Sequence, residues 1–357
     1  MRPHVLVARL DNDGDVLLSG PAVRAVAAGA GKVTYLCGPR GRAAAELLPG
    51  VDDVVVHRAP WIDPEPEPVS AEATRGLVAD LAAKGLDQAV VLTSFHQSPL
   101  PLALLLRLAG VPTVAAISED YPGSLLDVRH RVDDDVHEVE RSLSLVATLG
   151  YRLPEGDDGR LRVVYESEAP PELGPDPYVV VHPGASVPAR AWDPDACAGL
   201  VGALVDEGRR VAVTGSPDES ELTSRVAGAH PGVVDLGGGT DLAGLAAVLA
   251  GADVVVVGNT GPAHLAAAVG TPVVSLFAPT VPASRWRPWR VPHVLLGDQD
   301  IACAGCRARV CPVPGHPCVG TVSVAEVVAA VEGLAPQSGR GPAPAGAPPA
   351  VVGGRRA

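Results

Sequence analysis

Three aspartates near the N-terminus are the first residues in the chain that could do chemistry. Asp11, Asp13 and Asp15 lie between an apolar run and a helical pattern. A carboxylate at such a strand-to-helix corner can act as a general base, or it can cap the helix by accepting bonds from its first N–H groups. Gly14 permits a tight turn, after which Asp15 points from the helix start, so the Gly14-Asp15 pair is the more suggestive part of this loop, although both readings stay open. Asp13 and Gly14 are candidates for an acceptor site.

Three glycine-bearing loops in the second half of the chain could bind a diphosphate. Residues 182–186 (HPGAS) offer backbone N–H groups and a hydroxyl, and the nearby Arg190 can bind phosphate oxygens bidentately. Residues 259–262 (NTGP) begin a helix, whose N–H groups and dipole favour anions. Residues 215–219 end in Glu219, which could hold ribose hydroxyls. Each loop alone is a common turn, but together they predict binding of a nucleotide diphosphate.

The composition excludes several classes of protein. The net charge of −13 argues against nucleic acid as a partner, since binding needs a basic surface. No apolar stretch reaches the length of a membrane span, and Arg9 and Asp11 interrupt the N-terminal apolar run, so we expect a cytoplasmic protein without a signal peptide. The dinucleotide motif G-x-G-x-x-G is absent after the first strand, and the P-loop motif is absent throughout.

An alternation of short apolar strands and helices positions these loops. The first set of expected strands comprises residues 5–8, 33–38, 51–57, 89–94 and 113–118. The second set comprises residues 178–186, 210–216, 233–239, 252–261 and 272–280, with helices between them. Such alternation predicts an α/β protein with two doubly wound parallel sheets. The carboxyl ends of both sheets should then face a ligand cleft.

The 357 residues suggest two domains, and a polar, proline-rich segment near residues 168–177 marks the boundary. We therefore expect one domain over residues 1–168 and a second domain over residues 175–335, which carries the three loops predicted to bind a nucleotide diphosphate. Residues 336–357 lack periodicity and are predicted to be a disordered tail.

Several segments, in order, resemble glycosyltransferase family 9, the heptosyltransferase-like enzymes. The resemblance spans roughly residues 3–335 and is carried by RLDNDGDVLLSGPAV (9–23), HPGAS with Arg190 and Trp192, TGSPDE (214–219) and GNTGPAHLAAAVGTPVVSLFAPT (258–280). It implies the two-domain GT-B architecture, in which the N-terminal domain binds the acceptor and the C-terminal domain binds the nucleotide sugar. It also implies an inverting transfer that requires no metal or other cofactor. The donor would be a nucleotide-diphosphate sugar such as ADP-heptose, and the acceptor a glycan, a glycolipid or a small molecule.

The resemblance also implies roles for individual residues. Asp15 matches the aspartate that deprotonates the acceptor hydroxyl, and Arg190 stands where the family has a basic phosphate-binding residue. The residues implied to line the diphosphate are Ala185, Ser186, Thr260 and Gly261, with His264 close by. Asn259 departs from the family's Asp-Thr-Gly pattern at a position that tends to contact the donor sugar, which leaves the identity of that sugar open.

Three further groups of residues carry weaker signals. Cys303, Cys306, Cys311 and Cys318 have the number, but not the usual spacing, of a structural metal site, and a disulfide or free thiols are the alternatives. His96 and His137 are candidates for acceptor binding, against a core histidine and a solvated helix face respectively. The basic, aromatic run 285–290 could contact a membrane's inner face peripherally or bind an acceptor phosphate, although packing at a domain edge is the favoured interpretation.

Two other functions remain open at this point. A nucleotide-sugar epimerase or hydrolase of the same fold would use the same diphosphate site without an acceptor. A nucleotide-sugar-binding protein without catalysis would also need that site, although the Gly14-Asp15 pair argues against this reading.

Overall fold

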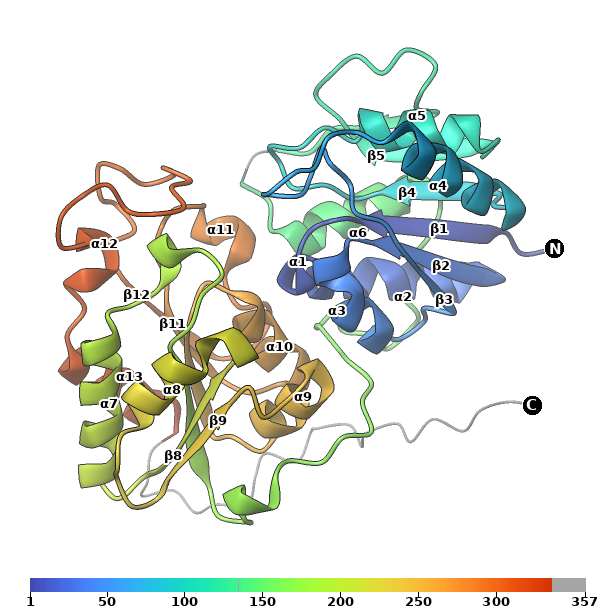
Figure 1. Ribbon diagram of the computed structural model, residues 1–357. Coiled ribbons are helices and arrows are strands. Elements are labelled where there is room, and N and C mark those ends of the chain that lie inside the picture. The colour runs from blue at the N-terminus through green and yellow to red at the C-terminus, as the bar shows by residue number, and fades with distance from the viewer. Residues whose placement is uncertain (134, 336–357) are drawn as a thin grey trace. The chain divides into compact units, whose positions relative to one another are not determined.

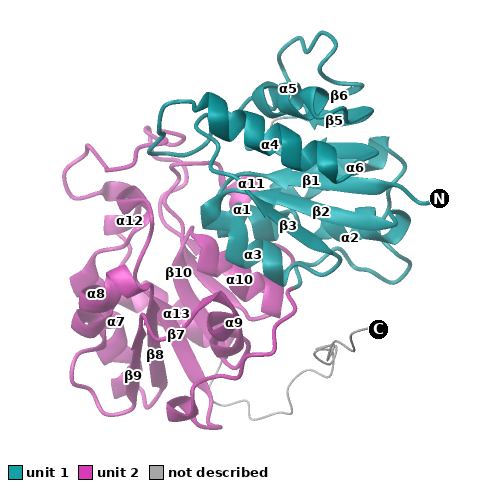
Figure 2. Cartoon of the chain, turned by 45° about the vertical axis from the view of Figure 1, so that its right-hand side comes forward, with its two compact units in different colours: residues 1–162 teal, residues 163–357 magenta. Residues whose placement is uncertain are grey.

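The structure is a computed structural model that describes residues 1–133 and 135–335. The predicted tail, residues 336–357, lies outside the described residues. The chain forms two compact units, one ending at Arg162 and the other beginning at Val163 (Figure 2). Each unit contains one six-stranded sheet flanked by helices (Figure 1). In the described part of the chain, no helix is both long and apolar enough to cross a membrane.

Unit 1 contains strands β1 to β6 and helices α1 to α6. The strands are β1 (His4–Arg9), β2 (Lys32–Cys37), β3 (Asp53–Val56), β4 (Gln88–Val91), β5 (Thr113–Ile117) and β6 (Val128–His130). The helices are α1 (Asp13–Leu18), α2 (Gly20–Gly29), α3 (Arg42–Leu47), α4 (Ala71–Ala83), α5 (Leu100–Leu108) and α6 (Glu138–Thr148). Helix α4 packs against α5, and α2 packs against α6, on opposite faces of the sheet (Figure 1).

Unit 2 repeats the same plan with strands β7 to β12 and helices α7 to α13. The strands are β7 (Tyr178–His182), β8 (Arg210–Gly215), β9 (Val233–Gly237), β10 (Val254–Gly258), β11 (Val273–Leu276) and β12 (His293–Leu296). The helices are α7 (Pro194–Asp206), α8 (Ser220–Ala227), α9 (Leu242–Ala250), α10 (Gly261–Val269), α11 (Ala283–Trp286), α12 (Pro317–Gly320) and α13 (Val324–Leu334).

The apolar strands form the cores of both units. Residues 5–8 of β1 and residues 254–257 of β10 are almost completely buried, as expected for central strands covered on both faces. Every strand pair in both sheets is parallel. The predicted pair of doubly wound parallel sheets is therefore confirmed.

The strand order places the functional loops. The orders are β3-β2-β1-β4-β5-β6 in unit 1 and β12-β11-β10-β7-β8-β9 in unit 2, which is the same order counted from the opposite edge. In such sheets, the chain leaves in opposite directions from two neighbouring central strands, and ligands bind beyond their carboxyl ends. These strands are β1 and β4 in unit 1 and β7 and β10 in unit 2.

The helical pattern after the aspartates forms two helices rather than the single helix that its periodicity predicts. Helix α1 ends at Leu18, and α2 begins at Gly20. Pro21 has no N–H group to continue the hydrogen bonding of α1, and the Ser19 hydroxyl donates to the Val16 carbonyl oxygen at 2.6 Å. The break keeps α1 short, next to the end of β1.

Candidate functional site

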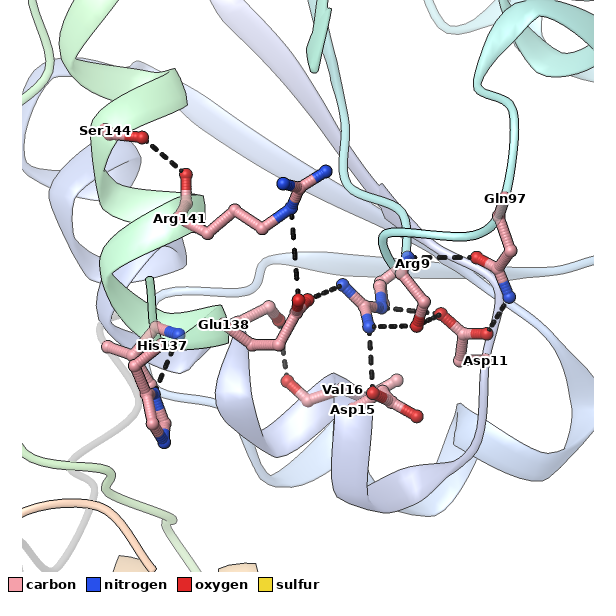
Figure 3. A network of polar contacts seen from close by, with 12 residues as sticks. Arg9, Asp11, Asp15, Val16, Gln97, His137, Glu138, Arg141 and Ser144 are labelled. Atoms are coloured by element: carbon pink, nitrogen blue, oxygen red, sulfur yellow. Dashed lines mark hydrogen bonds and ion pairs between the residues drawn. The ribbon is translucent and has the colours of Figure 1, made fainter. Parts of the chain in front are cut away.

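A buried arginine lies at the centre of the unit 1 site (Figure 3). Arg9 is the last residue of β1 and is only 2% exposed. Its Nε lies 2.6 Å from Asp11 Oδ2, and one terminal nitrogen donates to Glu138 Oε2 at 3.1 Å. The other terminal nitrogen donates to Asp15 Oδ1 and to Ser94 Oγ, both at 2.8 Å. We call Arg9, Asp11, Asp15, Glu138 and Ser94 the Arg9 network.

The members of the Arg9 network differ in their access to solvent. The side chains of Glu138 and Asp11 are 1% and 10% exposed, whereas that of Asp15 is 22% exposed. Burial lowers the pKa of Arg9, but the surrounding carboxylates outweigh this effect and raise it above its ordinary value, so the guanidinium stays charged. Asp15 is thus the carboxylate of the network best placed to meet a ligand.

Burial also raises the pKa values of Asp11 and Glu138, the two less exposed carboxylates of the Arg9 network. It raises the pKa of Asp11 to about 6, with repulsion from Asp15 adding to the effect and Arg9 opposing it. Burial raises the pKa of Glu138 in the same way, again opposed by Arg9. These carboxylates therefore bind protons more readily than ordinary surface carboxylates do.

The other candidates in unit 1 have separate positions. Asp13 Oδ1 accepts a hydrogen bond from Ala44 N at 3.0 Å, which ties α1 to α3, and Gly14 is buried in α1. His96 is exposed in the loop after β4, so it is not a core histidine, and its ring packs edge-on against Phe95. The structure therefore places His96, but not Asp13, at an open surface.

His137 lies next to the Arg9 network in sequence but is only 2% exposed. Its Nδ1 accepts from Val139 N at 3.2 Å and so caps α6. Glu138 and Arg141 are also buried, so this segment is not the solvated helix face considered as its alternative. Binding of an acceptor by His137 stays a prediction.

In unit 2, the loops that follow β7 and β8 lie against each other. His182 at the end of β7 contacts Thr214 Oγ1 at 2.9 Å, and burial lowers the His182 pKa. A Cβ atom at Gly184 would lie 2.1 Å from Glu219 Oε1, so only glycine permits this approach. Glu219 Oε2 accepts from the backbone N of Ser216 at 2.8 Å. Glu219 is therefore fixed beside the HPGAS loop, in which Ala185 is half-buried and Ser186 is exposed.

Arg190 lies in a short turn that is held from two sides. Its Nε donates to Thr280 Oγ1 at 3.3 Å, and its carbonyl oxygen would be only 2.7 Å from a Cβ atom at Gly258, the last residue of β10. The backbone N of the neighbouring Ala189 donates to Arg309 O at 2.9 Å, and the Ala189 carbonyl oxygen lies 3.1 Å from His316 Nε2, within hydrogen-bond distance. The cysteine-rich segment thus braces the turn that carries Arg190.

The loop between β10 and α10 presents buried polar atoms at a helix start. Asn259 is 5% exposed and donates from Nδ2 to Ala278 O at 3.2 Å. Within the described residues, Asn259 Oδ1 and Thr260 Oγ1 are buried and have no hydrogen-bond partner. Gly261 begins α10, and His264, one turn later, is 5% exposed. Buried polar atoms of this kind call for a bound partner, and the helix start favours an anion.

The cysteines do not form a metal site as they are arranged. All six are free thiols, and Cys303 and Cys306 are exposed whereas Cys318 is buried. Burial raises the pKa of Cys318, and the nearby Cys311 and Cys303 add to this effect. Among residues 1–133 and 135–335, no three His, Cys, Asp or Glu side chains are grouped so that they could hold a metal ion. The run 285–290 is partly buried, since Arg285 is 3% and Trp289 6% exposed.

Sequence reasoning missed Arg9 and Glu138 as members of the site. The available signal was an arginine at the end of an otherwise apolar strand, a position where charge is costly unless it is paired. Its partner, however, lies 129 residues away. Asp11, Ser94 and Gln97 complete the site, and Ser94 N donates to Gln97 Oε1 at 3.0 Å.

Comparison with solved structures confirms the GT-B fold. A glycosyl transferase family 9 protein from Veillonella parvula superposes with a TM-score of 0.72 at 18% identity, covering 93% of this chain and 97% of that one. The ADP-heptose lipopolysaccharide heptosyltransferase II of Escherichia coli gives a TM-score of 0.70 at 20% identity, covering 94% of this chain and 99% of that one. At these identities, the likeness concerns the fold.

Comparison of sequences identifies the family. Lipopolysaccharide heptosyltransferase 1 of Pseudomonas aeruginosa is 35% identical over 224 residues, which cover 60% of this chain and 61% of that relative. Other curated heptosyltransferases match over about half of their length. The model of glycosyltransferase family 9 (heptosyltransferase) matches residues 75–316, a segment that begins after Asp15 and includes all three unit 2 loops. The chain belongs to glycosyltransferase family 9.

Proposed function

We propose that the protein is an inverting glycosyltransferase that moves heptose or a related sugar from ADP-heptose or a similar donor to an acceptor hydroxyl. A glycolipid acceptor of the lipopolysaccharide type is favoured, because the curated relatives are named lipopolysaccharide heptosyltransferases. The observation that carries the proposal is the Asp15 carboxylate, which Arg9 holds at 2.8 Å while it stays 22% exposed.

Asp15 acts as the general base in this reaction. It removes the proton of the acceptor hydroxyl as the oxygen attacks the anomeric carbon of the donor sugar. The new carbon–oxygen bond forms on the face opposite the departing diphosphate, so the anomeric configuration inverts. A positioned base of this kind contributes roughly 100-fold to 10,000-fold to the rate. The buried Arg9 orients the Asp15 carboxylate by binding one of its two oxygens, at 2.8 Å.

The unit 2 loops hold the donor and stabilise the leaving group. Arg190 and the first N–H groups of α10 supply positive charge to the diphosphate, so we propose that transfer needs no metal ion. The other residues proposed to contact the diphosphate are Ala185, Ser186, Thr260, Gly261 and His264. Glu219 binds the ribose hydroxyls, and the buried Oδ1 of Asn259 accepts a hydrogen bond from the donor.

The acceptor side is proposed to involve the surface beside Asp15. His96, exposed after β4, and the Asp13-Gly14 turn that begins α1 contribute to this side, and His137 shapes it through the start of α6. The loops after β1 and β4 are neighbours in the sheet, which places His96 on the same edge as Asp15.

An Asp15→Asn variant tests the proposal. The asparagine keeps an oxygen for Arg9 but cannot act as a base. ADP release from ADP-heptose, measured with a heptose-free lipopolysaccharide acceptor, is expected to fall at least 100-fold in kcat. The dissociation constant for ADP, measured by calorimetry, should change less than twofold because the nucleotide is bound by unit 2.

The matched control is Asp80→Asn, which changes an exposed aspartate on α4 of the same unit. Its kcat should equal that of the unmodified protein. If Asp15→Asn retains more than a tenth of the activity while remaining folded, Asp15 is not the base and the proposed mechanism is wrong.

A further inference from the structure

Glu138 is an ionisable side chain that the mechanism above does not use. It is the first residue of α6, is 1% exposed, and shares Arg9 as a partner with Asp15. We propose that Glu138 is a positioning residue that, through Arg9, orients the Asp15 carboxylate. This inference rests on the proposed role of Asp15 as the base.

The contacts of Arg9 explain how such positioning works. A guanidinium is planar, and its donors point in fixed directions. One terminal nitrogen donates to Glu138 at 3.1 Å, and the other donates to both Asp15 and Ser94 at 2.8 Å. The third nitrogen, Nε, forms an ion pair with Asp11 at 2.6 Å. Because the plane is held at three points, removing the Glu138 contact lets the guanidinium tilt, and the Asp15 carboxylate moves with it.

The burial of Glu138 is hard to explain as a stabilising feature. Within the described residues, its Oε1 is buried and accepts no hydrogen bond, and that oxygen lies 3.9 Å from Arg141 Nε. Replacing a buried ion pair by apolar residues is often neutral or stabilising, so such a pair is weak evidence for a stabilising role. A buried carboxylate oxygen without a hydrogen bond requires an explanation, and a role in catalysis is one that such groups commonly have.

The charges around Arg9 explain the expected effect on pH dependence. Among the described residues of unit 1, the charged groups in contact with Arg9 or with its partner Glu138 are the carboxylates of Asp11 and Asp15 and the guanidinium of Arg141. The neutral groups nearby are the side chains of Ser94, Gln97 and Tyr35. Burial raises the pKa of Asp11, and repulsion from Asp15 and Glu138 adds to this effect.

Groups that interact this closely titrate together rather than singly. Burial raises the pKa of both Asp11 and Glu138, so the network already tends to hold a proton. Neutralising Glu138 removes one of the negative charges that raise the pKa of Asp11, and so lowers the affinity of Asp11 for its proton. The acid limb of the kcat/KM profile should therefore move to lower pH, by about one unit for a charge at this range.

Two substitutions at Glu138 separate geometry from charge. Glu138→Gln keeps an oxygen for Arg9 but no charge, so kcat near neutral pH should stay within about threefold while the acid limb moves down by about one pH unit. Glu138→Ala removes the contact altogether, so kcat should fall about 10-fold to 100-fold, as expected when a positioned base loses its orientation, with KM for the donor nearly unchanged. The control is Glu140→Gln, an exposed glutamate on the same helix, which should change neither quantity.

A second measurement does not depend on substrate. Protein labelled with ¹³C at the aspartate carboxyl carbons reports the titration of Asp11 by nuclear magnetic resonance. In Glu138→Gln, the Asp11 resonance should titrate at lower pH than in the unmodified protein, because Glu138 contributes to the raised pKa of Asp11. This measurement decides the charge effect even if Glu138→Ala fails to fold.

The outcomes distinguish this inference from the proposed function. If Asp15→Asn is inactive while both Glu138 variants show unchanged kcat and an unchanged acid limb, the positioning role is wrong and the function stands. Equal losses of kcat in Glu138→Gln and Glu138→Ala, with no shift of the limb or of the Asp11 resonance, would indicate a purely structural residue. If Asp15→Asn remains active, the proposed function itself fails.

Discussion

Asp13 offers a test of how burial acts on the aspartate-rich turn. Its carboxylate is half-buried and accepts one hydrogen bond, from Ala44 N at 3.0 Å. Burial raises the pKa of Asp13 to about 6, and the bond from Ala44 opposes this effect only in part. Replacing Asp13 with asparagine keeps an acceptor for Ala44 N and removes the buried charge. We therefore expect Asp13→Asn to stabilise the protein at neutral pH.

The size and sign of the effect follow from the shift in pKa. The folded-state value of about 6 exceeds the ordinary value of 3.8, so the folded protein binds this proton more tightly than the unfolded chain does. The cost of ionised Asp13 is absent below about pH 4, grows as the pH rises to 6, and is complete above 6. A shift of about 2 units corresponds to roughly 3 kcal/mol. Since Asp13 lies in the first turn of α1, the helix dipole recovers about 0.3–1 kcal/mol of this cost, which leaves about 2 kcal/mol.

Urea unfolding followed by circular dichroism at pH 4, 5, 6 and 7.5 measures this difference. The gain in free energy of unfolding for Asp13→Asn should be close to zero at pH 4 and about 2 kcal/mol at pH 7.5. Asp13→Ala is the matched variant, because it also removes the acceptor for Ala44 N and should be less stable than Asp13→Asn by about 1–3 kcal/mol. A gain in stability that does not depend on pH, or a loss of stability at pH 7.5, would contradict the conclusion that burial of ionised Asp13 destabilises the protein.

Two further predictions concern unit 2. Gly184→Ala would place a Cβ atom 2.1 Å from Glu219 Oε1, so Glu219 must move and the dissociation constant for ADP should rise about 10-fold by calorimetry, as for the loss of one good hydrogen bond. Gly76→Ala is the control, because a Cβ atom added at Gly76 would meet no neighbouring atom within 4 Å, and it should leave ADP binding unchanged. Asn259→Asp replaces the donor to the Ala278 carbonyl with a buried charge, so thermal unfolding should show a loss of about 1–3 kcal/mol that is larger at pH 8 than at pH 5.

Much of the fold could be predicted from local sequence, because central strands and their loops have short-range signatures. The apolar runs before Asp11, His182 and Asn259 gave strands ending within a few residues of the observed positions. The alternation also predicted parallel sheets, since helices follow strands along the chain. The break at Ser19 was missed because the apolar periodicity continues across it, whereas the hydrogen bonding does not.

The order of the strands could not be read from the chain, and much of the site depends on it. The loop after β4 lies beside the loop after β1 only because β1 and β4 are neighbours, and this brings Ser94 and Gln97 to Arg9 and Asp11. Glu138 is the first residue of α6, the helix that follows the last strand of unit 1 in the sequence. The sequence showed that Asp15 could be a base, but its orienting partners are a property of the tertiary structure.

The separation between Arg9 and Glu138 has a consequence for biosynthesis. These residues are 129 positions apart, and the strand that carries Arg9 leaves the ribosome long before α6 does. Until α6 docks, the guanidinium lacks one of its three carboxylate partners and retains a route to water. The end of unit 1 that carries Arg9 and Asp15 should therefore mature as one of the last steps of its cotranslational folding, after the sheet itself has assembled.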